Sequence, residues 1–250
     1  MIVAALTALL FTPALQPFAI TVDGVERHAL IAYPTKATAK APLVFAFHGH
    51  GGNMNYSARR YAIDKEWPAA IVVYMQGLPA KGMTDPEGTK NGWQQRAGTD
   101  GDRDIKFFDQ TLAYLETHAK VDTHRIYSMG HSNGAAFSYV LWISHPNLFA
   151  AIGVVAGGFG RAQGMAPVPL LHMGSETDTV VPYAFQKLSV ERVKRINGCT
   201  GEGKPWEGNG TMWDSTSGSP VVLYPYEGGH KFPDNAVPLI VKFFKLFTRP

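Results

Sequence analysis

The chain has 250 residues, of which 45% are hydrophobic, and this is the size of one large α/β domain with a substantial core. Its formal net charge is only +3, and its 23 lysine and arginine residues are spread along the sequence, which excludes a basic nucleic-acid-binding surface. The single cysteine, Cys199, cannot form a disulfide within the chain, so the core has to hold the fold together.

Residues 2–11 form an apolar stretch that is followed by Thr12-Pro13-Ala14, a pattern typical of the cleavage region of a secretory signal. The stretch is too short to cross a bilayer, so we expect no membrane span. No lysine or arginine precedes Arg27, and an apolar N-terminal tail is the alternative. We expect residues 1–14 to be a signal-peptide-like segment and residues 15–250 to be a single domain.

The first half of the domain predicts a sheet that begins with a hairpin. Residues 18–22 and 26–33 alternate in polarity around Asp23-Gly24, which favours two antiparallel strands. Near-continuous apolar runs at residues 42–47 and 70–74 are typical of parallel strands covered on both faces. Between Asp104 and Lys120, apolar residues three and four apart predict an amphipathic helix with Asp104 as its N-cap.

The second half continues the alternation of strands and helices. Strands are predicted at residues 151–156, 168–173 and 221–224, and helices at 183–196 and 236–247. Residues 198–220 are expected to form a long loop or a hairpin. Only about ten residues separate the strands on either side of position 160, which leaves no room for a large lid. The fold class is therefore α/β, a doubly wound and mostly parallel sheet with an antiparallel N-terminal hairpin.

A Gly-x-Ser-x-Gly pattern lies between a predicted strand and a predicted helix. The strand covers residues 126–129, the pattern is Gly130-His131-Ser132-Asn133-Gly134, and helix-forming residues 135–142 follow. This setting predicts a nucleophile elbow, a sharp turn that strains the serine backbone and leaves no space for side chains at the two glycines. Ser132 is therefore the candidate nucleophile.

A serine hydroxyl needs a histidine to accept its proton and a carboxylate to orient that histidine. In this fold both should follow later strands, in the order serine, acid, histidine. Asp178 lies in the loop after residues 170–173, and His230 lies in a glycine-containing loop after residues 221–224. Glu176 and Asp214 remain alternatives for the acid.

Acyl transfer also requires two N–H donors for the developing oxyanion. The backbone N–H of Asn133 follows the nucleophile directly, and the glycine-rich loop at residues 48–53 should supply the second donor from His50, with Gly51 as the alternative. His48 and His50 also match a His-x-His metal pair, but no well-spaced aspartate or cysteine accompanies them. We expect no metal and no cofactor.

Four motifs together resemble the α/β-hydrolase esterases of the feruloyl esterase and polyhydroxybutyrate depolymerase type. They are His48-Gly49-x-Gly51-Gly52, the Gly130 to Gly134 elbow, Asp178 followed by Val181-Pro182, and Gly228-Gly229-His230 followed by Pro233. The similarity runs from about residue 18 to residue 247. It implies an α/β-hydrolase fold and a secreted or periplasmic serine esterase whose catalytic residues are Ser132, Asp178 and His230.

The chain departs from this resemblance at two positions. Phe232 stands where many relatives carry tryptophan, and Cys199 is alone where secreted relatives often have a disulfide. Both departures bear on the substrate and on secretion.

Aromatic side chains in predicted loops are candidates for substrate contact. Trp93, Tyr56 and Phe159 are the main ones, with Trp206 and Trp213 as further candidates, and packing in the core is the alternative for each. We expect a small-molecule or oligomeric ester, of the feruloyl type or of the short hydroxyalkanoate or polyester type, cleaved through an acyl-enzyme. A peptidase of the prolyl-oligopeptidase kind and a catalytically inactive binding module on a hydrolase scaffold are the alternatives.

Overall fold

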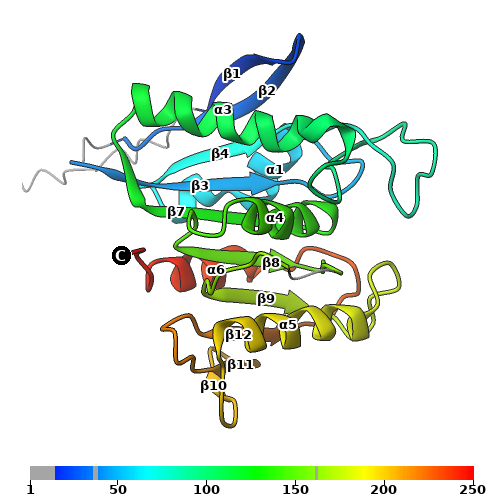
Figure 1. Ribbon diagram of the computed structural model, residues 1–250, viewed down its shortest axis with the longest axis vertical. Coiled ribbons are helices and arrows are strands. Elements are labelled where there is room, and N and C mark those ends of the chain that lie inside the picture. The colour runs from blue at the N-terminus through cyan, green and yellow to red at the C-terminus, as the bar shows by residue number, and fades with distance from the viewer. Residues whose placement is uncertain (1–14, 36–38, 161–162) are drawn as a thin grey trace, which may run out of the picture.

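The computed structural model describes residues 15–35, 39–160 and 163–250, and ten of its strands form one sheet with helices on both faces (Figure 1). The strand order is β1-β2-β4-β3-β7-β8-β9-β12-β11-β10. Their bounds are β1 (Leu15–Val22), β2 (Val25–Ala32), β3 (Ala41–Phe47), β4 (Ile71–Met75), β7 (Val121–His131), β8 (Ala151–Val155), β9 (Leu170–Gly174), β10 (Lys204–Trp206), β11 (Gly210–Trp213) and β12 (Val221–Pro225). The signal-like segment predicted at residues 1–14 lies outside the described residues.

The centre of the sheet is parallel and its edges are antiparallel. Strands β4, β3, β7, β8, β9 and β12 pair in parallel, whereas the β1–β2 hairpin joins β4 antiparallel and the β10–β11 hairpin joins β12 antiparallel. Every residue of β3, β4, β8 and β9 is buried, as their continuous apolar sequences predict. The predicted α/β-hydrolase fold with an antiparallel N-terminal hairpin is confirmed.

Two layers of helices cover the sheet. Helices α3 (Arg103–His118), α4 (Asn133–Ser144) and α5 (Tyr183–Asn197) contribute to one apolar core. Helices α1 (Met54–Tyr61), α2 (Ile63–Glu66) and α6 (Ala236–Phe244) contribute to the core on the opposite face (Figure 1). A short 3₁₀ turn (Asp100–Asp102) and the two-stranded pair β5 (Leu78–Pro79) and β6 (Asn91–Gly92) lie between β4 and α3. In the part of the chain that the structure describes, no helix is long and apolar enough to cross a membrane.

The parallel strands bring four loops to one edge of the sheet. Strands β3, β7, β9 and β12 run parallel, with β8 between β7 and β9, and in Figure 1 the arrows of β3 and β9 point the same way, so the segments that follow these four strands meet at their carboxyl ends. The described residues between β8 and β9 contain no helix, in agreement with the expected absence of a large lid there. This edge is where an α/β sheet places its ligand site.

Two local expectations are decided by the structure. Residues 198–220 form the β10–β11 hairpin, which extends the sheet beyond β12. The expectation that Asp104 is the N-cap of α3 is wrong, because the helix begins at Arg103 and the Asp104 carboxylate points into the protein. There it accepts hydrogen bonds from the Arg27 guanidinium and from the Gln94 backbone N–H.

The ion pair between Arg27 on β2 and Asp104 on α3 is fully buried. The Nη2–Oδ1 distance is 2.7 Å, and the side chains are 1% and 0% exposed. A second guanidinium nitrogen donates to the Arg103 carbonyl oxygen, and the guanidinium lies 4.4 Å from the centre of the Phe107 ring. The pair therefore joins the N-terminal hairpin to the helix that covers it.

We expect Arg27→Met to lower the free energy of unfolding by about 3–5 kcal/mol, because it removes the buried cation that donates a hydrogen bond to Asp104 and leaves only Arg103 at 3.7 Å. Urea denaturation at pH 7 measures this loss. Lys106→Met is the control, since Lys106 pairs with Asp23 at the surface and should lose less than about 1 kcal/mol. Equal losses in the two variants would contradict the account.

Candidate active site

The turn from β7 into α4 forces Ser132 into a strained backbone conformation, with φ 56° and ψ −119°. A Cβ atom at Gly130 would lie 2.3 Å from the carbonyl carbon of Gly134, and one at Gly134 would lie 2.3 Å from the carbonyl oxygen of Phe47. Side chains cannot approach backbone atoms so closely, so both positions of the elbow require glycine. This turn places the Ser132 hydroxyl at the N-terminus of α4.

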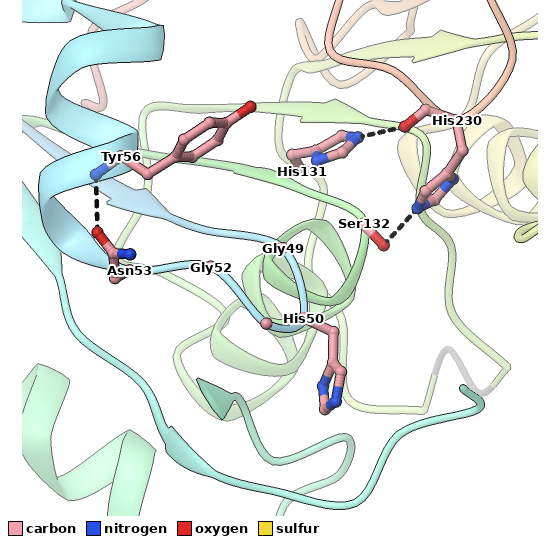
Figure 2. A pocket seen from close by; sticks show the side chains of 9 residues that line it. Gly49, His50, Gly52, Asn53, Tyr56, His131, Ser132 and His230 are labelled. Carbon is pink, nitrogen blue, oxygen red and sulfur yellow. Dashed lines mark hydrogen bonds between the residues drawn. The ribbon is translucent and has the colours of Figure 1, made fainter. Parts of the chain in front are cut away.

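The structure brings Ser132, His230 and Asp178 together from three different loops. His230 Nε2 lies 2.7 Å from Ser132 Oγ, and His230 Nδ1 lies 2.8 Å from Asp178 Oδ2 and 3.1 Å from Oδ1. Figure 2 shows the His230 ring directed at the Ser132 hydroxyl. Catalysis by a serine nucleophile, a base and an orienting acid requires side chains in this order.

The Asp178 carboxylate is held by the backbone as well as by His230. Its Oδ1 accepts the N–H groups of Val180 and Val181, both at 2.8 Å. The two alternative acids lie elsewhere: Glu176 is exposed, and Asp214 forms an exposed ion pair with Lys204. Of the three candidates, only Asp178 contacts the histidine.

The backbone N–H groups of His50 and Asn133 have no acceptor within the described ranges. The N–H of Gly51, the alternative donor, is already used, since it donates to the Asn91 carbonyl oxygen at 2.7 Å. His50, Ser132 and His230 line the same cavity of about 330 Å³. The geometry leaves His50 and Asn133 free to donate to an oxyanion.

The imidazole of His50 turns away from Ser132 (Figure 2) and anchors its loop. Its Nε2 lies 3.1 Å from Asp85 Oδ2, and that oxygen also accepts the Lys90 backbone N–H at 2.8 Å. The Lys90 N–H, followed by His50, holds the pKa of the Asp85 carboxyl well below its usual range. A Cβ at Gly92 would lie 2.7 Å from His50 Nδ1, so the ring needs a glycine beside it.

His48 cannot act as a metal ligand in this arrangement, because both ring nitrogens are occupied. Nδ1–H donates to the Gly49 carbonyl oxygen at 2.8 Å, and Nε2 accepts the Gly77 N–H at 3.0 Å. Burial lowers the pKa of His48 to about 4, so the ring is neutral at pH 7. The described residues contain no group of three or more histidine, cysteine or carboxylate side chains that could hold a metal ion.

His131, the neighbour of Ser132, supports His230 and does not face the Ser132 hydroxyl. Its Nε2–H donates to the His230 carbonyl oxygen at 3.1 Å (Figure 2). Burial lowers the pKa of His131 to about 4, which keeps the ring neutral. Phe232, the residue that departs from the resemblance, packs edge-on against His131 and in a tilted arrangement against Tyr61.

The aromatic candidates separate into one that lines the cavity and two that do not. Tyr56 is 47% exposed and lines the cavity beside Ser132. The expectation for Trp93 and Phe159 is wrong, because both rings are buried in the core. Trp93 stacks on Phe137 and donates its indole N–H to the His48 carbonyl oxygen, while Phe159 packs on the ring of Tyr139.

Comparison with known proteins identifies the family of the chain. The sequence model of the family described as esterase PHB depolymerase matches residues 27–191. The chain belongs to this family. It is therefore a carboxylic-ester hydrolase.

Two relatives illustrate the similarity in sequence. "Probable feruloyl esterase C" of Aspergillus flavus is 26% identical over 214 residues, which cover 82% of this chain and 76% of that protein. The bifunctional acetylxylan esterase/xylanase of Neocallimastix patriciarum is 26% identical over 165 residues, which cover 64% of this chain and 23% of that protein.

Solved structures show the same fold. An acetyl xylan esterase from Aspergillus awamori superposes with a TM-score of 0.72 at 14% identity, covering 93% of this chain and 99% of that one. A ferulic acid esterase from Anaeromyces mucronatus, solved with ferulic acid, superposes with a TM-score of 0.65 at 16% identity, covering 94% and 90%.

Three neutral histidines, of which His48 and His172 are fully buried and His131 reaches the cavity wall, predict that the protein loses stability in acid. The pKa values of His48, His131 and His172 on β9 are each lowered by burial to about 4, against 6.5 in the unfolded chain. The unfolded state therefore takes up these protons first, so stability is full above pH 6.5 and falls as the pH drops towards 4. At pH 5 each histidine accounts for a loss of about 2 kcal/mol.

Urea denaturation between pH 7 and pH 5 measures this slope. His131→Gln should lower the slope of the free energy of unfolding against pH by the equivalent of about one bound proton, because it removes one of the three histidines. A wild-type slope in His131→Gln would show that His131 does not titrate in this way.

Proposed function

We propose that the chain hydrolyses carboxylic esters through a Ser132, His230 and Asp178 triad and a covalent acyl-enzyme. The hydrogen-bonded series from Ser132 Oγ through His230 to Asp178 is the observation that carries this proposal. The distance of 2.7 Å places His230 Nε2 within reach of the hydroxyl proton, and the Asp178 carboxylate holds the ring with its Nδ1 protonated.

The reaction proceeds in two halves. Ser132 Oγ attacks the ester carbonyl carbon while its proton passes to His230 Nε2, and collapse of the tetrahedral intermediate breaks the bond to the alcohol, which takes that proton. A water molecule then attacks the acyl-enzyme with His230 as its base, and the acid leaves as the Ser132 hydroxyl is restored. No cofactor is required by these steps.

The N–H groups of His50 and Asn133 stabilise the oxyanion in this proposal. Both lie beside the nucleophile without an acceptor in the described part of the chain, and each such donor contributes about 3 kcal/mol to transition-state stabilisation. The contact between the His50 imidazole and Asp85 fixes the loop that presents the first of these donors. Preorganisation of this kind avoids reorganisation during the reaction.

The substrate that we propose carries a phenolic or short acyl group on a soluble or oligomeric alcohol. The cavity of about 330 Å³ is large enough for one aromatic acyl group, and Tyr56 offers an exposed ring at its wall. The names of the relatives, feruloyl esterase and acetylxylan esterase, support the same range of esters.

Triad variants test the roles. Ser132→Ala and His230→Ala should lower kcat about a million-fold, and Asp178→Asn about ten-thousand-fold because the histidine adopts the wrong tautomer. Glu176→Gln is the matched control and should retain wild-type kcat, since Glu176 is exposed and does not contact His230. Near-wild-type activity in Asp178→Asn would assign the acid to another residue.

Initial rates on methyl ferulate and p-nitrophenyl butyrate test the substrate. We expect Ser132-dependent cleavage of both, and Tyr56→Ala should raise KM for methyl ferulate about tenfold while changing KM for the butyrate less than twofold. Cleavage of the butyrate alone would restrict the acyl group to short aliphatic chains. Cleavage of neither would favour an inactive scaffold.

A further inference from the structure

A buried glutamine contacts the proposed acid from behind. Gln186 on α5 is fully buried, and its Nε2 donates to Asp178 Oδ2 at 3.1 Å and to the Val181 carbonyl oxygen at 2.7 Å. Both partners can only accept hydrogen bonds. The two amide protons are therefore both used, and the orientation of the carboxamide is fixed.

The other end of the carboxamide leads to a buried histidine. Gln186 Oε1 lies 3.4 Å from His172 Nε2, and His172 Nδ1 lies 3.0 Å from the Tyr139 hydroxyl. Burial lowers the pKa of His172 to about 4, so the ring carries a single proton at pH 7. That proton belongs on Nε2, because Gln186 Oε1 faces this nitrogen and can only accept, and Nδ1 is then free to accept from the Tyr139 hydroxyl.

The Tyr139 end of this hydrogen-bond network lies on α4, the helix that follows Ser132. Tyr139 lies on α4, two turns after Ser132, and its ring is locked against Phe159 and Trp142. A Cβ atom at Gly174 would lie 2.7 Å from Gln186 Oε1, so only glycine leaves room for the carboxamide. The three polar side chains thus connect α4, β9 and α5 behind the active site.

The Asp178 carboxylate needs this second support. The backbone N–H groups of Val180 and Val181 hold only Oδ1, whereas Oδ2 accepts from His230 and from Gln186. The other titratable groups close to this carboxylate are His131 and Tyr226, and within the described residues neither forms a hydrogen bond with it. Without Gln186, Asp178 Oδ2 would accept a hydrogen bond only from His230, the residue that gains and loses a proton in the proposed reaction.

We propose that Gln186 is a positioning residue for ester hydrolysis, and that His172 and Tyr139 hold it in place. Gln186 keeps Asp178 Oδ2 in the orientation that accepts the His230 Nδ1–H as the base gains and loses its proton. The inference rests on the proposed triad, through which Gln186 acts.

Gln186→Met tests this role, because methionine keeps the length of the side chain and removes both donors. We expect kcat to fall about 10- to 100-fold with KM within about twofold of wild type, since a misplaced acid affects the chemical step. The acid limb of the pH dependence of kcat should move to higher pH, because a carboxylate that has lost a donor binds the His230 proton more strongly. Wild-type kcat and an unmoved acid limb would overturn the proposal.

Ser189→Ala is the matched control on the same helix. Ser189 is equally buried and bonds to Phe159 and Phe185 without touching the triad. It should lower Tm while leaving kcat of the folded protein within about twofold of wild type, so a general loss of packing is separated from a positioning effect. Tyr139→Phe removes a single hydroxyl and carries the same test if Gln186→Met does not fold, with an expected loss in kcat of about two- to tenfold.

A double-mutant cycle with Asp178→Asn decides whether Gln186 acts through the acid. In the Asp178→Asn background, Gln186→Met should lower kcat less than about twofold further. Losses that multiply would overturn the positioning role and leave the triad intact. Wild-type activity in Asp178→Asn alone would instead overturn the proposed triad and this inference together.

Discussion

The passage from β7 into α4 holds Ser132 at φ 56° and ψ −119°, a conformation that residues with side chains rarely adopt and that typically costs about 1–3 kcal/mol. Packing on both sides of the turn offsets this strain. Strand β7 is paired on both edges, and Phe137 and Leu141 of α4 are fully buried. Because the turn is fixed between two packed elements, the position of the Ser132 hydroxyl is fixed as well. The loops of His230 and Asp178 are arranged around that position.

Neutral histidines connect these loops to one another. His48 joins the loop after β3 to Gly77, His131 joins the elbow to the loop of His230, and His172 joins α4 to α5. In His48 and His172 one ring nitrogen donates a hydrogen bond and the other accepts one. A charged imidazole has no acceptor nitrogen, so it could not form both hydrogen bonds. These contacts of His48 and His172 therefore require the neutral form of each ring.

Much of the fold could be predicted from the sequence because its signals are local. Continuous apolar runs identified the parallel strands, and the glycine-flanked serine identified the elbow. Ser132, Asp178 and His230 come together because each follows a strand of the same parallel sheet. The order of the motifs along the chain carries that information.

Other features depend on contacts between distant segments, which the sequence pattern does not contain. Trp93 and Phe159 lie in segments that the sequence predicts to be loops, yet both rings are buried in the core. Asp104 has the residue type and position of a cap, but the pairing with Arg27, 77 residues earlier, draws its carboxylate inward. Gln186 and His172 belong to no sequence motif. Their connection to Asp178 is visible only in the hydrogen bonds of the folded chain.

The most direct test of this account is the detection of the acyl-enzyme itself. Purified protein is mixed with p-nitrophenyl butyrate, quenched in acid during the first turnover, digested and analysed by peptide mass spectrometry. The account predicts a butyryl group on the peptide that contains Ser132, and no such group in Ser132→Ala. Rapid turnover with a butyryl group on another residue, or with undiminished activity in Ser132→Ala, would contradict it.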